Sequence, residues 1–236
     1  MHLGSIDYFI GYRLEEEENV LRQEIKICIP FYKMAYSLIF LAVLSLIRGI
    51  IYVDEIGIAM DANIGLLAAV FCAETYVMEQ NGKRYEVFRL FPMKNKCRAI
   101  FRRLLVQNLY LCLISYIGYF FFYWQKPIEI YVSSEYSYCI YLIAVTGSCV
   151  FWSAFSMTMA NLCRNQWAGI GISMVLWLLL NSKIGEQIWG NFNIFAYSFR
   201  NLSDAYDLSW LWGKGVGILL AICMIGMIPY ILEKRG

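Results

Sequence analysis

The chain has 236 residues, of which 60% are hydrophobic and 16% are charged, and its formal net charge is +2. A soluble domain has about 25% charged residues, so this composition excludes an ordinary soluble protein and favours a membrane protein. The small net charge gives no reason to expect a nucleic-acid partner.

The apolar residues are gathered in blocks of roughly 20, the helix length that crosses a bilayer. Six blocks follow one another, at residues 31–53, 58–78, 104–124, 138–162, 167–181 and 208–232. We therefore predict an all-α integral membrane protein with six transmembrane helices. No internal repeat or linker divides them, so residues 31–236 are expected to form one transmembrane domain.

An amphipathic helix is predicted over residues 5–29, before the first span. Leu14, Leu21 and Ile25 recur at helical spacing with other apolar residues, and Glu15 to Glu18 supply a polar side. Pro30 ends this helix. Residues 1–30 are thus expected to be a cytoplasmic helix, which either lies on the inner membrane surface or packs on another protein.

Lys and Arg residues are divided unequally between the two sets of loops. One side has 14, and the other has three, Lys126, Lys183 and Arg200. Since basic loops stay in the cytoplasm, we expect both termini to be cytoplasmic, in a cell membrane of the bacterial inner or plasma type. The 14 residues are Arg13, Arg22, Lys26, Lys83, Arg84, Arg89, Lys94, Lys96, Arg98, Arg102, Arg103, Arg164, Lys234 and Arg235.

Residues 182–207, on the side opposite the basic loops, are semi-polar but rich in aromatic rings such as Trp189, Phe195 and Tyr197. Such rings favour the depth of the lipid headgroups. The segment is predicted to be either a re-entrant element or an ordinary external loop.

Charged residues inside the predicted spans are candidate functional residues, because burying a charge in hydrocarbon is costly. Arg48 is expected to extend outward to Asp54, Glu55 and Asp61, or else to line a translocation cavity. Lys214 is expected to extend outward as well. Asp61 and Glu74 make the second span the most polar.

Several kinds of chemistry lack their usual residues. The eight cysteines include no CxxC pair and His2 is the only histidine, so we expect no metal site and no catalytic residues. Glu17, Glu18 and Arg22 match the EExxxR motif of CAAX-protease-like peptidases, but the histidines of that family are missing. There is no GxxxxGK[ST] phosphate loop, so any ATPase would be a separate chain.

The most informative segment is the loop between the second and third predicted spans, 79–103. Gly82 can end the preceding helix, and Pro92 ends the next one. Tyr85, Phe88 and Phe91 recur at three-residue spacing and predict an aromatic side on a short helix. Beside them lie Glu86 and Arg89. An exposed aromatic side with flanking charges suits a protein partner, and the alternative is contact with lipid headgroups.

This loop resembles the loop of type 2 ATP-binding-cassette (ABC) exporter permeases. Glu79 falls on the family's acidic position, Gly82 on its glycine, Glu86 on its glutamate, Leu90 on its hydrophobic turn and Pro92 on its proline. In one departure, Glu86 follows Gly82 by four residues, where the family usually has three. The layout of spans and termini is similar too.

The resemblance implies a permease subunit that moves an amphipathic substrate, such as a peptide, a drug or a lipid-like molecule, out of the cytoplasm. The loop would be a coupling helix that binds an ATP-binding-cassette ATPase subunit, where ATP and Mg would bind; no cofactor is expected on this chain. A second permease subunit, identical or homologous, would complete a dimer. The alternative is a stand-alone gradient-driven transporter or channel that uses Arg48, Asp61 and Glu74, and a membrane enzyme ranks third.

Overall fold

The computed structural model describes residues 22–80, 86, 88, 90–129, 133–200 and 206–235. Most of the predicted N-terminal helix, with Gly82, Tyr85 and Arg89 of the loop, lies outside these residues. The described residues form a bundle of helices, and the one β-bridge among them joins Tyr52 to Ile128. The prediction of an all-helical fold is confirmed for the described residues.

Four helical segments are long and apolar enough to cross a membrane. They are Val53–Val77, which joins α3 (Val53–Cys72) to α4 (Glu74–Val77); α6 (Met93–Tyr123); α7 (Ser134–Cys163); and Leu211–Lys234. The last combines α11 (Leu211–Gly226) with α12 (Ile228–Arg235). The short 3-10 helix η1 (Met78–Gln80) follows α4.

Two further candidates are bent pairs of helices. The helix Arg22–Cys28 meets α2 (Phe31–Ile47) at 57°, and α8 (Gln166–Leu180) meets the segment Lys183–Phe192 at 74°. The described chain therefore has four membrane-spanning candidates, or up to six if each bent pair is one span.

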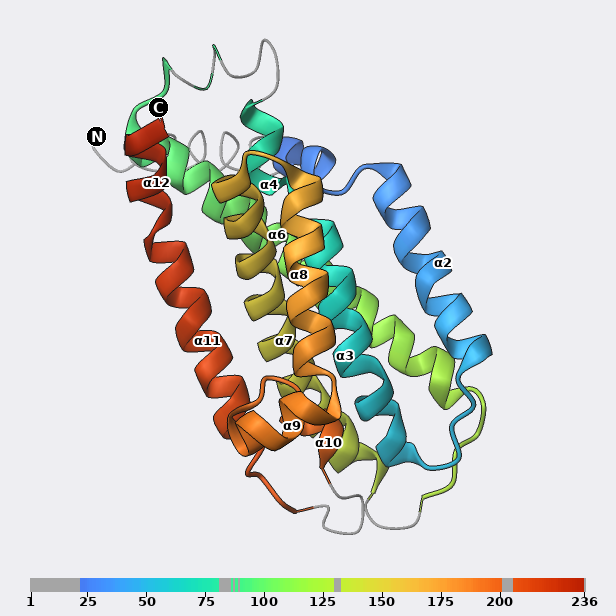
Figure 1. Ribbon diagram of the computed structural model, residues 1–236. Helices are drawn as coiled ribbons and strands as arrows, with labels where there is room; N and C mark the ends of the chain where they lie inside the picture. The colour runs from blue at the N-terminus through green and yellow to red at the C-terminus, as the bar shows by residue number, and fades with distance from the viewer. Residues whose placement is uncertain are drawn as a thin grey trace, which may run out of the picture.

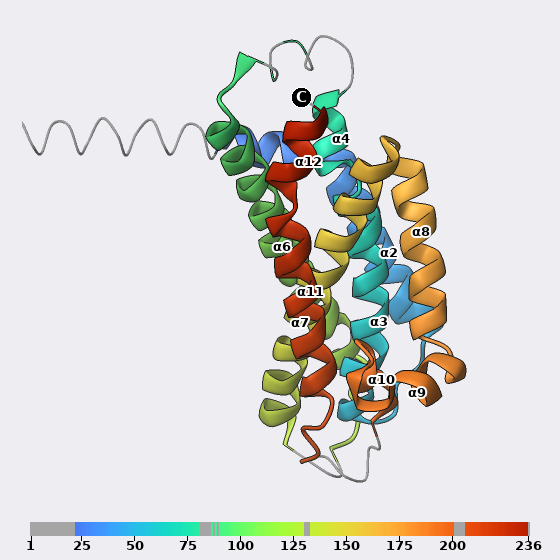
Figure 2. The same ribbon diagram turned by 60° about the vertical axis from the view of Figure 1, so that its left-hand side comes forward.

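The helices run between two ends of the bundle. One end, here called the α12 end, holds α12, α4 and the start of α6 (Figure 1). The other, the α9 end, holds α9 (Lys183–Trp189) and α10 (Ala196–Phe199). Helices α2 and α11 lie on opposite flanks, with α3 and α7 between them (Figures 1 and 2).

Helix α3 is the centre of the bundle. In the most apolar part of the segment Val53–Val77, to which α3 belongs, 78% of the residues are buried, against 28% in Leu211–Lys234. Small residues allow close packing: a Cβ at Gly65 would lie 2.7 Å from Cδ1 of Trp152 in α7. Ser156 of α7 donates a hydrogen bond to the Ala69 carbonyl at 2.5 Å. Gly65 and Ala69 lie four residues apart on α3, and both make close contact with α7 of the same chain.

The predicted first span is wrong at its far boundary. The apolar run predicts a helix as far as residue 53, but α2 ends at Ile47 and α3 begins at Val53. The Glu55 carboxylate accepts hydrogen bonds from the backbone N–H groups of Ile51 and Tyr52 at 3.0 and 3.2 Å, and so starts α3 early. The sixth predicted span matches the candidate span Leu211–Lys234, which has a one-residue interruption at Met227 near Pro229, whose ring nitrogen cannot donate a helix hydrogen bond.

The described part of the segment 182–207 folds back into the bundle instead of forming a simple loop. After α9 and the 3-10 helix η2 (Gly190–Phe192), Phe195 stacks on Trp152 with ring centroids 5.6 Å apart. The side chain of Asn193 donates to the Leu180 carbonyl at 2.8 Å, below the short helix α8. This segment fills the α9 end, where α8 stops.

Candidate functional site

Buried ion pairs form the candidate site. The deepest joins three helices: α3 with Asp61, α7 with Ser148 and α11 with Lys214. Lys214 Nζ donates to Oδ2 and Oδ1 of Asp61 at 2.6 and 2.8 Å, and to Ser148 Oγ at 2.7 Å. Ser148 Oγ donates in turn to Asp61 Oδ1 at 2.7 Å. The side chains of Lys214 and Asp61 are 3% and 0% exposed.

The expectation that Lys214 extends outward is therefore wrong. Its stem lies along Gly147 of α7, where a Cβ would come within 3.3 Å of Lys214 Cβ and Cδ. Asp61, the ninth residue of α3, lies about 12 Å along the helix from its start. Because an unpaired charge at this depth is costly, the pair and the gap at Gly147 together turn the lysine inward.

Ser148 and Lys214 are close enough for a serine nucleophile and a lysine base, but their hydrogen bonds argue against that use. Lys214 directs its three donors at Asp61 and Ser148 as an ammonium paired with a carboxylate, and an ammonium has no lone pair to accept a proton. Both Ser148 and Asp61 are fully buried, which gives a substrate no approach in this conformation. We interpret the cluster as an ion pair that holds α11 to α3 and α7.

A second ion pair lies nearer the α12 end. Lys33 Nζ of α2 is 2.6 Å from Glu74 Oε1 and donates to the Phe71 carbonyl at 2.9 Å. Tyr32 also donates to Glu74 Oε1, at 3.2 Å. Helix α2 buries Lys33, Ser37 and Leu41, so this ion pair is one of its buried contacts with the bundle. The predicted candidate Glu74 is thus a partner of Lys33.

A third cluster lies at the base of the predicted coupling loop. Arg103 of α6 donates from Nε to Glu24 at 2.7 Å and from Nη1 to Glu79 at 2.5 Å. Glu79, expected to be a coupling residue, is buried here, and so is Glu24. Arg103 therefore joins the helix Arg22–Cys28, η1 and α6.

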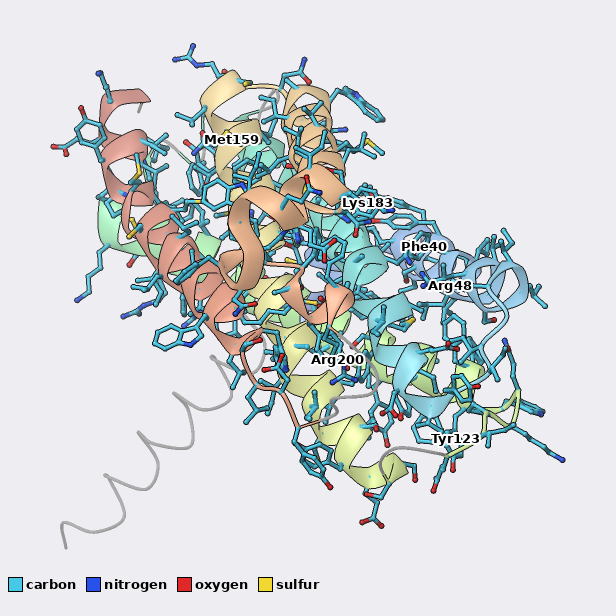
Figure 3. All side chains as sticks on the ribbon, turned by 60° about the horizontal axis from the view of Figure 1, so that its bottom comes forward. Phe40, Arg48, Tyr123, Met159, Lys183 and Arg200 are labelled. Atoms are coloured by element: carbon cyan, nitrogen blue, oxygen red, sulfur yellow. The ribbon has the colours of Figure 1, made fainter. Side chains whose placement is uncertain are left out.

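Arg48 does not make the contacts predicted for it. It is exposed at the end of α2, at the α9 end that Figure 3 brings forward, where Arg48, Lys183 and Arg200 are labelled. The three expected partners are engaged elsewhere: Ser137 donates to Asp54, Glu55 caps α3, and Asp61 binds Lys214. Among the described residues Arg48 forms no ion pair, so the structure does not bring Arg48, Asp61 and Glu74 together.

The described part of the coupling loop differs from the predicted aromatic side. Phe88 packs inward against Tyr76, with ring centroids 6.3 Å apart, and Lys96 Nζ lies 5.7 Å from its ring centroid. Leu90 and Phe91 are 85% and 50% exposed, and Glu86 is exposed. Pro92 directly precedes α6 as its N-cap. In the described part of the loop that precedes α6, the exposed apolar groups are therefore Leu90 and Phe91.

Sequence patterns contain little information about these contacts. Charge alone allows Lys33 and Lys214 to pair with Glu74 and Asp61, but the sequence does not show which helices are neighbours. Ser148 carries no signal beyond its place next to Gly147. In the part of the chain that the structure describes, no three His, Cys, Asp or Glu side chains form a metal-binding group.

Comparisons of this chain with protein families, with curated proteins and with solved structures find no match.

Proposed function

We propose that this chain is the membrane-spanning permease subunit of an ATP-driven ABC exporter. In this proposal all six candidate segments cross the membrane, the α12 end faces the cytoplasm, and ATP is hydrolysed on a partner subunit. The partner would close on ATP, push the loop and switch the permease from inward- to outward-facing. A second permease subunit, identical or homologous, would complete the assembly.

The observation that supports this proposal best is the loop at the α12 end. Leu90 and Phe91 project from it with 85% and 50% exposure. Further along α6, Arg103 binds both Glu79, at the start of the loop, and Glu24, so the start of the loop is tied to α6 and to the helix Arg22–Cys28. Exposed apolar side chains on a loop that is held to two helices suit a contact with a moving partner. A displacement of the partner would then move α6 instead of only deforming the loop.

The proposal is tested by purification from native membranes, followed by identification of an ATP-binding-cassette ATPase by its peptides. Phe91→Ala should weaken this association at least roughly tenfold, as truncation of an interface anchor does. Phe101→Ala is the matched control, because Phe101 is 51% exposed but lies on α6. Equal association of ATPase with both variants and the wild type would contradict the proposal.

A gradient-driven transporter is the second candidate, and the buried pair of Asp61 and Lys214 favours it. Charged residues at such depth often belong to ion pathways. The test is transport by proteoliposomes that contain this chain alone, driven by an ion gradient. Uptake that Asp61→Asn abolishes would favour this candidate over the exporter.

A further inference from the structure

Five basic residues at the α12 end form a surface that the proposed function does not use. Arg22 and Lys26 are exposed on the helix Arg22–Cys28, Lys94 and Arg98 are exposed on α6, and Arg102 is partly exposed. None of the five forms an ion pair with a residue that the structure describes. We call these five residues the basic patch.

The two halves of the basic patch are held beside each other. Glu24 lies between Arg22 and Lys26 in sequence and bonds to Arg103, the neighbour of Arg102. Figure 2 shows the helix Arg22–Cys28 beside the first part of α6. The nearby carboxylates of Glu24 and Glu79 are both bound to Arg103. Two carboxylates and one guanidinium leave a net charge of −1 on this cluster, so among the described residues the five cations of the patch exceed it.

The position of the basic patch along α6 indicates which kind of molecule contacts it. Lys94, Arg98 and Arg102 recur every four residues and so lie along one side of the helix. From Phe101 onward the large exposed side chains of α6 are apolar: Phe101, Leu105 and Leu109 are 51%, 46% and 62% exposed. The exposed surface therefore changes from cationic to apolar at Arg98–Arg102, as expected where lipid headgroups give way to acyl chains.

The helix Arg22–Cys28 has the same mixed character. Ile25 and Ile27 are 42% and 37% exposed between the basic residues, and the helix bends 57° away from α2. A bent, short amphipathic helix at the end of a span suits the membrane interface. Both halves of the patch thus combine exposed apolar groups with cations that have no ion-pair partner among the described residues.

We propose that the basic patch binds acidic phospholipid headgroups, with the lipid chains lying against the apolar side of α6. The headgroup phosphate would neutralise Arg98 and Arg102 together with Lys26 or Arg22. A lipid fits this patch better than the ATPase does, because the patch continues into the lipid-facing side of α6. The tip at Leu90 and Phe91, in contrast, projects beyond α6. This inference does not depend on the exporter proposal.

The test uses the full chain in neutral detergent, with thermal unfolding followed by tryptophan fluorescence. Titrated dioleoyl-phosphatidylglycerol should raise the unfolding midpoint saturably, and dioleoyl-phosphatidylcholine should not. In Arg98→Gln/Arg102→Gln the apparent affinity should fall at least roughly tenfold. Arg98→Lys/Arg102→Lys should keep most of the affinity, which separates loss of charge from damage to the fold.

Controls for charge elsewhere on the protein and for headgroup specificity complete the test. Lys126→Gln/Lys183→Gln removes two exposed cations at the α9 end and should respond to phosphatidylglycerol as the wild type does. Salt at about 1 M should reduce the response, since it shortens the screening length to about 3 Å. An equal shift from phosphatidylcholine or from glycerol 1-phosphate would overturn the proposal. So would an unchanged affinity in Arg98→Gln/Arg102→Gln, and if that variant instead lost a protein partner, the patch would be a protein interface.

Discussion

Lys214 of α11 places its ammonium 2.6 Å from Oδ2 of Asp61 in α3, and both side chains are buried. Helices in a membrane gain little from the hydrophobic effect when they associate, so polar contacts and close packing decide which helices stay together. Helix α11 buries Gly213, Lys214, Gly217 and Ala221 along its length. The ion pair is therefore a main attachment of this helix.

Breaking the pair should destabilise the protein more than removing it. Lys214→Met leaves Asp61 buried and unpaired, and should lower the free energy of unfolding by about 3–5 kcal/mol. The double variant Asp61→Leu/Lys214→Met should recover much of this loss. Thermal unfolding in detergent measures both, with Lys183→Met as a control at an exposed lysine. A stability of Lys214→Met equal to that of the wild type would show that the pair does not hold α11.

Two glycines of α11 should respond oppositely to alanine. A Cβ at Gly213 would lie 1.9 Å from the Asn193 carbonyl oxygen, so the segment after α9 would have to move. Gly213→Ala should cost about 1–3 kcal/mol, as overpacking does. At Gly215 a Cβ would meet nothing within 4 Å, and Gly215→Ala should stabilise the helix by up to about 1 kcal/mol. Equal unfolding midpoints for the two variants would contradict the packing of the α9 end.

Arg48→Ala should change stability by less than about 0.5 kcal/mol, because Arg48 is exposed and has no ion-pair partner among the described residues. The sequence alone predicts a larger effect, through Asp54, Glu55 and Asp61. Unfolding of Arg48→Ala beside Arg48→Lys distinguishes the two views. A loss of stability as large as that of Lys214→Met would show that Arg48 does form the predicted ion pair.

Membrane orientation is testable with an impermeant thiol reagent on intact cells. In variants with a single cysteine, Cys97 near the start of α6 should stay unlabelled, and Ser133→Cys before α7 should be labelled. Permeabilised cells provide the control, in which both should react. Labelling of Cys97 from outside would place the α12 end outside the cell and remove the basis for a cytoplasmic ATPase.

The sequence is a good guide to which segments are helical and apolar, because length and composition determine this locally. It is a poor guide to boundaries where polar capping interrupts an apolar run. Ile50, Ile51 and Val53 extend the apolar pattern past the end of α2, and the break depends on Glu55 bonding back to the backbone.

The sequence could not assign partners to the charges, because partners depend on helix neighbours. Lys214 turns inward since Gly147 of a different helix leaves room for its stem, and Phe88 turns inward since Tyr76 offers it a surface. Periodicity places Phe88 on the same side as Phe91, but it does not show that the bundle already covers part of that side.

The exporter proposal requires that conformational change in an ATPase subunit is transmitted to this chain through Leu90 and Phe91. ATP hydrolysis by the reconstituted complex tests this requirement most directly. The complex in nanodiscs would be compared for the wild type, Leu90→Ala/Phe91→Ala and the control Phe101→Ala. We expect hydrolysis to depend on this chain and to fall at least roughly tenfold in the double variant, while Phe101→Ala stays near the wild type. Hydrolysis that is the same with all three chains, or with no chain present, would contradict the account.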